Sequence, residues 1–212
     1  MQLPDLNGLT RHNALALGDA CTAFDPLSGH GLFWSCSSAL SAAAIVLSLR
    51  EDGSEQRRAL CQDFYRQRIL GTFRHQAEIG REFYQLAGKT DAFWQERGHW
   101  QLDDDALQPT QPEALTGRAV LFRGAAIRAG RVVETTLLQV PGEHGPVAWF
   151  GEIALADTLQ RYHAQRQAGQ TVNAQTFHHL CGEGISVQAA QACWQWLQAR
   201  QLLEEAPAWL GD

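Results

Sequence analysis

Two groups of residues near the N-terminus have the types and the spacing of a ligand site. Asp19 follows Gly18 at the end of an apolar run, residues 15–17, so an acceptor-only carboxylate lies where that run ends. The missing side chain of Gly18 leaves room for a ligand, and a sugar hydroxyl suits the carboxylate. Residues 29–31 (Gly-His-Gly) then open a charge-free segment, and a helix starting there presents unpaired N–H groups to an anion.

The neighbouring sequence predicts the elements that position these groups. Residues 13–17 predict a strand, and residues 31–50 predict a helix rich in alanine and serine, whose small side chains allow close packing. Glu51-Asp52-Gly53-Ser54 ends that helix. Apolar residues at helical spacing then predict a second, amphipathic helix over residues 55–86. The sequence therefore predicts strand, acidic turn and two long helices.

The second half of the chain has a different character. An acidic, proline-bearing stretch over residues 98–117 predicts a domain boundary, and the alternation around Ala129-Gly130 predicts a β-hairpin of residues 126–128 and 132–137. Helices are then expected over residues 153–166, 173–180 and 186–201, with Asn173 and Ser186 as caps. This order predicts a small helix-turn-helix or winged-helix unit.

Composition excludes several classes of partner. The net charge is −6 and the arginines are spread among acidic residues, so no basic stripe for nucleic acid is present. Residues 39–49 form a low-charge run that is expected to be too short to span a bilayer. Five cysteines without a C-x-x-C, and an N-terminus without a signal-peptide pattern, predict a cytoplasmic protein. The spacing of His178, His179 and Cys181 fits no zinc pattern, and no metal site is expected.

The stretch from residue 18 to residue 32 resembles the second FAD-binding motif of the flavoprotein monooxygenase and halogenase superfamily. That motif is a Gly-Asp-Ala turn followed by Pro-Leu-small-Gly-x-Gly-Leu. The resemblance implies that the aspartate binds a ribityl hydroxyl of FAD and that the helix start donates N–H groups to the N1–C2=O edge of the flavin. The cofactor-binding residues that it implies are Gly18, Asp19, Pro26, Ser28, Gly29, His30, Gly31 and Leu32.

The resemblance also implies a fold and its limits. A Phe-Trp-x-x-Arg stretch at residues 93–97 stands where these flavoproteins often carry one, so the resemblance extends over residues 13–100. It implies an α/β fragment, the C-terminal part of a Rossmann-like FAD-binding domain with long helices, followed by a small, mainly helical, winged-helix-like domain. The expected domains are the flavin part over 1–104, an acidic linker with the hairpin over 105–150, and the helical domain over 151–212.

The Gly-x-Gly-x-x-Gly motif that opens a dinucleotide-binding domain is absent from this sequence. The chain is therefore expected to need a missing N-terminal half or a partner chain, and to bind FAD poorly and associate when isolated. A flavin reductase is a further possible partner. No catalytic residue is assigned, because the flavin supplies the redox chemistry. For His30, a structural role is favoured over proton transfer.

The reaction that the resemblance implies is the hydroxylation of an aromatic, tryptophan-like substrate. Tryptophan halogenases carry a carboxylate inside the Pro-Leu turn, where this chain has Ser28, and this difference favours a monooxygenase over a halogenase. The pattern is also similar to flavoenzymes that modify tryptophan within a partner protein during maturation of quinone-cofactor oxidases. The substrate is then an aromatic small molecule or a tryptophan in a protein. A halogenase relative, and a non-catalytic module whose acidic C-terminal helices dock a protein or peptide, remain the alternatives.

Overall fold

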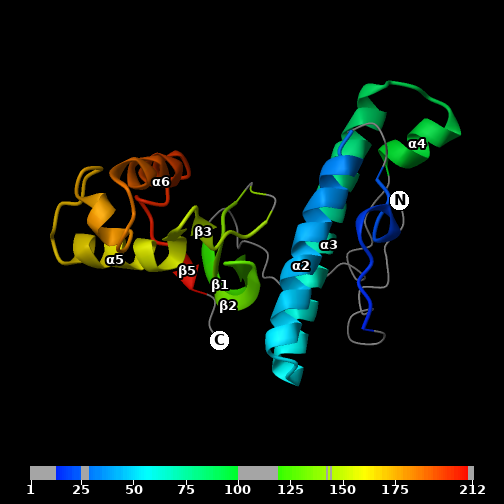
Figure 1. Ribbon diagram of the computed structural model, residues 1–212. Coiled ribbons are helices and arrows are strands. Elements are labelled where there is room, and N and C mark those ends of the chain that lie inside the picture. The colour runs from blue at the N-terminus through cyan, green and yellow to red at the C-terminus, as the bar shows by residue number, and fades with distance from the viewer. Residues whose placement is uncertain (1–12, 25–28, 100–118, 142, 144, 210–212) are drawn as a thin grey trace. The chain divides into compact units, whose positions relative to one another are not determined.

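The computed structural model of this chain describes residues 13–24, 29–99, 119–141, 143 and 145–209. The fold is mixed α/β, with several helices and a small sheet. The chain divides into two compact units (Figure 1): unit 1 is Met1–Gln111 with Ala125–Val133, and unit 2 is Pro112–Gly124 with Glu134–Asp212. The hairpin tip thus belongs to unit 1, although residues far along the chain form it. The three expected domain ranges stay a prediction.

Unit 1 is built on two long helices that lie side by side in Figure 1. Helix α2 covers Gly31–Glu51 and α3 covers Glu55–Leu86, so both helix predictions are confirmed. The break between them is stabilised by capping: the Ser54 hydroxyl accepts a hydrogen bond from the Arg57 N–H at 3.2 Å. A short 3-10 helix, η1 (Gly18–Ala20), precedes α2, and α4 (Ala92–Gly98) follows α3.

The core of unit 1 forms where the inner face of α2 meets α3 and the hairpin tip. Alanine and serine on α2 bring its backbone close to its neighbours, and larger side chains fill the remaining space. The buried members of this core are Cys21, Trp34, Ala44, Ile45, Cys61, Tyr65, Ile69, Ala125 and Val132.

The strand predicted over residues 13–17 is wrong. These residues form no strand in the structure, although Leu17 has extended backbone angles. The reason is the hydrogen-bond partner of Ala16: the Tyr65 hydroxyl of α3 accepts from its N–H at 3.2 Å and donates to its carbonyl at 3.0 Å. A side chain therefore occupies the backbone groups that a neighbouring strand would pair.

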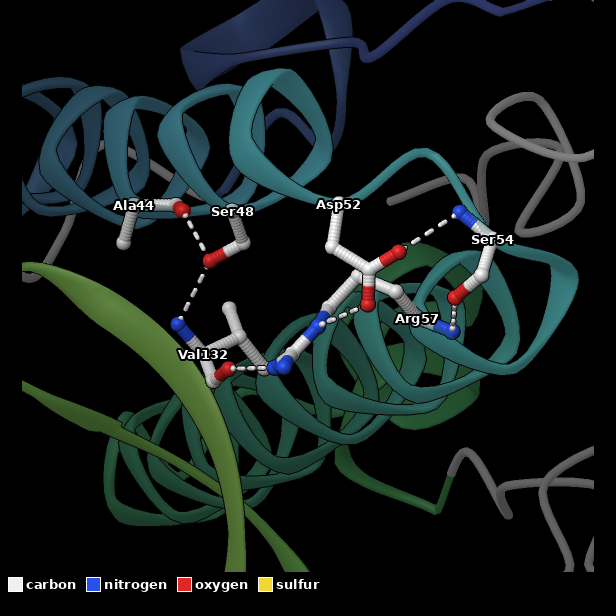
Figure 2. Close-up of polar contacts among 6 residues, drawn as sticks. All are labelled: Ala44, Ser48, Asp52, Ser54, Arg57 and Val132. Carbon is white, nitrogen blue, oxygen red and sulfur yellow. Dashed lines mark hydrogen bonds and ion pairs between the residues drawn. The ribbon is translucent and has the colours of Figure 1, made fainter.

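The hairpin tip is held to the helices through the backbone of Val132 (Figure 2). The Ser48 hydroxyl of α2 accepts a hydrogen bond from the Val132 N–H at 2.8 Å and donates to the Ala44 carbonyl at 2.8 Å. The Arg57 guanidinium donates to the Val132 carbonyl at 2.7 Å and contacts the Asp52 carboxylate at 3.5 Å. Arg131 adds an ion pair with Glu51. Both backbone groups of one buried residue are thus satisfied by helix side chains.

Ser48→Ala is expected to destabilise the fold by about 1–3 kcal/mol, because it leaves the buried Val132 N–H without a partner. Urea unfolding followed by circular dichroism measures the change. Ser41→Ala is the matched control, since Ser41 lies on the same helix, is also buried and donates only to the Ser37 carbonyl of its own helix. Equal losses in the two variants would contradict the role given to Ser48.

Unit 2 contains the base of the hairpin and the C-terminal helices. Strands β1 (Val120–Arg128), β2 (Arg131–Gln139) and β5 (Ala208–Trp209) form a sheet in the order β2-β1-β5, with β5 parallel to β1. The hairpin prediction is confirmed, and the strands are longer than expected. A second, antiparallel pair joins β3 (Trp149–Phe150) to β4 (Ile153–Ala154).

Two of the three helices predicted for unit 2 are confirmed, with shifted bounds, and the one predicted over residues 173–180 is not. Helix α5 covers Leu155–Gln167, because residues 153–154 pair as β4 instead. The segment at 173–180 is a turn followed by a 3-10 helix, η4 (Phe177–Leu180), with the Asn173 side chain accepting from two turn N–H groups. Helix α6 covers Val187–Ala199, and Ser186 caps it as predicted, accepting from the Ala189 N–H at 3.1 Å.

The core of unit 2 holds two cysteine thiols next to large apolar side chains, including the fully buried Phe177 and Leu159. Burial raises the pKa of Cys181 to about 11 and that of Cys193 to about 12. Because the thiolate is the form that binds metal or attacks, both side chains act here as small apolar groups.

Candidate functional site

The acidic turn and the start of α2 are brought together by hydrogen bonds to Gly18. The Gly18 N–H donates to the Ser38 hydroxyl at 3.0 Å, and the Trp34 indole N–H donates to the Gly18 carbonyl at 3.1 Å. Ser38 also donates to the Ser35 carbonyl, which keeps its hydroxyl oriented. The turn that carries Asp19 is therefore fixed against the first two turns of α2.

The turn requires a glycine at position 18 for a different reason from the one expected. Its φ is +53°, in the left-handed region, and a Cβ built on it would lie 2.8 Å from the Ser35 Oγ. The space that the missing side chain leaves is thus filled by α2, and the interpretation of that space as room for a ligand is wrong. Direct contact between Gly18 and a flavin stays a prediction.

Asp19 lies on the outside of this turn. Its side chain is exposed, and its carboxylate makes no hydrogen bond or ion pair with any residue in the described part of the chain. The neighbouring Gly18 is buried and anchored on both of its backbone groups. An exposed, acceptor-only carboxylate on a fixed turn has the chemistry to accept a hydrogen bond from a ligand hydroxyl.

The start of α2 offers N–H groups to the same region. The first intrahelical bond runs from the Trp34 N–H to the His30 carbonyl at 2.8 Å, so the preceding N–H groups have no acceptor within the helix. The His30 side chain makes no capping hydrogen bond. Residues 29–32 are all exposed, and a Cβ on Gly29 or Gly31 would meet nothing within 4 Å among the described residues. Open space therefore surrounds the glycines.

Two of the expected flavin contacts, Pro26 and Ser28, lie outside the described residues. The structure thus places Gly18, Asp19, Gly29, His30, Gly31 and Leu32 at one end of α2. The roles of these residues in cofactor binding stay predictions.

The side chains that hold the site were not predicted from the sequence. Trp34 and Ser38 stand four residues apart on α2, so they share one face of the helix, and both bond to Gly18. The four-residue spacing was the signal in the sequence that could have indicated their shared role. Tyr65 lies far along the chain, and no local pattern marks it. Its hydroxyl also contacts the buried Cys21 thiol at 3.8 Å, and burial raises the pKa of Cys21.

The Phe-Trp-x-x-Arg stretch lies on α4, against the end of α3. Phe93, Trp94 and Tyr84 of α3 contact one another edge to face, with ring centroids 5.4–6.1 Å apart. The Arg97 guanidinium lies 4.8 Å from the Phe93 ring centroid, and the Gln85 amide donates to the Gly98 carbonyl at 2.6 Å. In unit 1 this stretch therefore packs α4 against the C-terminal end of α3.

Comparison with known proteins gives one informative likeness. No protein-family model matches the chain, and no curated protein matches it. Among solved structures, the chain is similar to the peptidyl tryptophan dihydroxylase QhpG, which is essential for tryptophylquinone cofactor biogenesis. The likeness has a TM-score of 0.61 and 28% sequence identity over 87% of this chain. The chain spans 40% of the length of that dihydroxylase.

Proposed function

We propose that this chain is the C-terminal part of an FAD-dependent monooxygenase that hydroxylates a tryptophan within a protein substrate. The observation that carries the proposal is the likeness to the peptidyl tryptophan dihydroxylase over 87% of the chain. The motif at residues 18–32 also supports a flavin enzyme, because it resembles the second FAD-binding motif of flavoprotein monooxygenases. Hydroxylation is favoured over halogenation, since Ser28 stands where halogenases carry a carboxylate.

The donor set at the end of α2 fits a flavin. The exposed carboxylate of Asp19 has acceptors for the hydroxyls of a ribityl chain, and the uncapped start of α2 presents N–H groups and a positive dipole end to an anionic edge. The open space at Gly29 and Gly31 allows a ring system to approach the backbone. Bound FAD would supply the oxygen activation. These residues would bind and orient it and keep water from its face.

The fold that we propose for each unit follows from the same resemblance. Unit 1 would be the C-terminal part of a Rossmann-like FAD-binding domain, and unit 2 a winged-helix-like domain. Support for the second comes from a three-stranded sheet accompanied by α5 and α6. A cytoplasmic location is supported by the cysteines, all five of which are free thiols.

The test begins with the coding sequence upstream of this chain. We expect a polypeptide with a strand followed by Gly-x-Gly-x-x-Gly, in frame or as a neighbouring gene, and a yellow complex when both parts are produced together. Incubation with reductant, oxygen, chloride and a tryptophan-containing partner peptide should add oxygen to the indole, as read by mass spectrometry. A chlorinated product would support the halogenase alternative. A folded, colourless complex that only retains a peptide would support the docking module.

Asp19→Ala is expected to weaken FAD binding in that complex by about 1–3 kcal/mol, because an ionised acceptor is lost from the site. The dissociation constant measured by flavin fluorescence should rise roughly fivefold to 150-fold. Asp63→Ala is the matched control, since Asp63 is an exposed carboxylate on α3, and it should bind FAD like the unchanged protein. Unchanged affinity in Asp19→Ala would remove Asp19 from the site.

A further inference from the structure

Helix α2 exposes a continuous apolar face, which we name the outer stripe. Its large side chains are Leu32, Phe33, Leu40 and Val46, with exposed fractions of 78%, 70%, 73% and 55%. The smaller residues Cys36, Ala39 and Ala43 lie exposed between them. Steps of three and four residues connect these positions, so they follow one side of the helix. None of the seven is charged.

The outer stripe is unusual because the opposite face of α2 is already buried. Trp34, Ile45 and Ser48 face the core of unit 1, so the helix is apolar on both sides. A helix that is apolar all round is typically enclosed on all sides, and soluble monomers rarely expose a contiguous apolar face of this length. The stripe therefore has the character of an interface.

A membrane is a poorer partner for this face than a protein. The expectation that the low-charge run is too short to span a bilayer is wrong, because Gly31–Glu51 is long and apolar enough by length and composition alone. Of its apolar window, however, 39% is buried in the fold. Its inner face also uses hydroxyl groups to bind the backbone of Gly18 and Val132. These bonds commit one side of α2 to its own unit, and the small residues Ala39 and Ala43 let another protein backbone approach the other side.

We propose that the outer stripe of α2 is the interface for the dinucleotide-binding polypeptide that completes the enzyme, which would cover it with an uncharged, apolar surface. The identity of this covering polypeptide rests on the proposed function. The argument for it is length: the chain corresponds to 40% of the dihydroxylase, so the larger part of that protein lies outside the likeness. The stripe also begins at Leu32, next to the glycines that would meet the flavin. The partner that holds the rest of the cofactor therefore has to approach this end of α2.

The test places a photo-crosslinking amino acid at position 43 of the full chain, produced in its native host. Ala59, an exposed alanine on α3, is the matched control position. The proposal expects position 43 to crosslink to the sequence that carries the Gly-x-Gly-x-x-Gly motif, and position 59 not to do so. Crosslinks from position 43 to lipid, to a second copy, to residues 134–209 of the same chain, or to nothing would overturn the proposal.

A charge in the stripe provides a second, independent readout. Ala43→Glu should weaken co-purification with the dinucleotide-binding polypeptide about tenfold or more, because it buries a carboxylate in the interface, whereas Ala59→Glu should have no effect. Cys36 is the exposed thiol of the five, so its maleimide labelling should be fast in the isolated chain and slow in the complex. Equal association of both glutamate variants, or unprotected Cys36 in the complex, would overturn the interface. A covered stripe in a complex without flavin would instead contradict only the proposed function.

Discussion

Trp34→Ala is expected to destabilise the chain by about 3–5 kcal/mol, because a large buried side chain is lost. The Trp34 side chain is 3% exposed, and its indole N–H donates to the Gly18 carbonyl. Its ring contacts the Phe24 ring edge to face, with the two ring centroids 5.6 Å apart. Its removal would leave a cavity and also free the turn that carries Asp19. Urea unfolding of the isolated chain measures the loss of stability, without any need for the cofactor.

Trp34→Phe separates the two contributions of the indole. It keeps most of the ring in the core and loses only the hydrogen bond to Gly18, so we expect a loss of about 0.5–1.5 kcal/mol beyond any repacking cost. In the complete enzyme this variant should fold and bind FAD less tightly, because the turn is less firmly fixed. A phenylalanine variant as unstable as the alanine variant would show that the hydrogen bond, and not the packing, dominates.

Gly18→Ala is expected to destabilise the chain by about 2–5 kcal/mol in the absence of any flavin. The left-handed backbone at φ +53° costs a non-glycine residue about 1–2 kcal/mol. A Cβ at 2.8 Å from the Ser35 Oγ adds an overpacking cost of about 1–3 kcal/mol. A loss limited to the backbone cost of about 1–2 kcal/mol would show instead that the space beside Gly18 is open.

The double variant Gly18→Ala with Ser35→Ala isolates the steric part of that loss. Removing the Ser35 hydroxyl leaves its Cβ as the nearest atom, at 3.4 Å, which is an ordinary contact distance. We therefore expect a double-mutant cycle to recover the overpacking cost and leave the backbone cost in place. A coupling energy near zero would show that the two residues are not in contact.

The long helices and the hairpin were predictable because their signals are local. A charge-free run, the break at residues 51–54 and the alternation around Ala129-Gly130 each lie within a few residues of the feature that they produce. Ser186 was predictable as a cap for the same reason. Such elements follow from propensity and pattern without knowledge of the tertiary structure.

The arrangement around Asp19 was only half predictable. The motif located the acidic turn and the helix start, but its supports come from Trp34, Ser38 and Tyr65, whose roles depend on how α2 and α3 pack. The failed strand at residues 13–17 has the same origin. An extended, apolar segment predicts a strand, yet pairing needs a neighbour, and here a tyrosine hydroxyl takes that place. Long-range partners of this kind leave no local trace in the sequence.

The contacts of Val132 have a consequence for the edge of the sheet. β2 is an outer strand, and an outer strand with free backbone groups is a template for pairing with other chains. Its outward backbone N–H and C=O groups are hydrogen-bonded near both ends of the strand. The side chains of Ser48 and Arg57 bond to the N–H and C=O of Val132. The Leu138 N–H donates to the Val147 carbonyl at 2.8 Å, and the Val147 N–H donates to the Leu138 carbonyl at 2.9 Å. Only a short central stretch of this edge could accept a foreign strand. The same bonds that hold the hairpin tip in place therefore protect the chain against edge-to-edge aggregation.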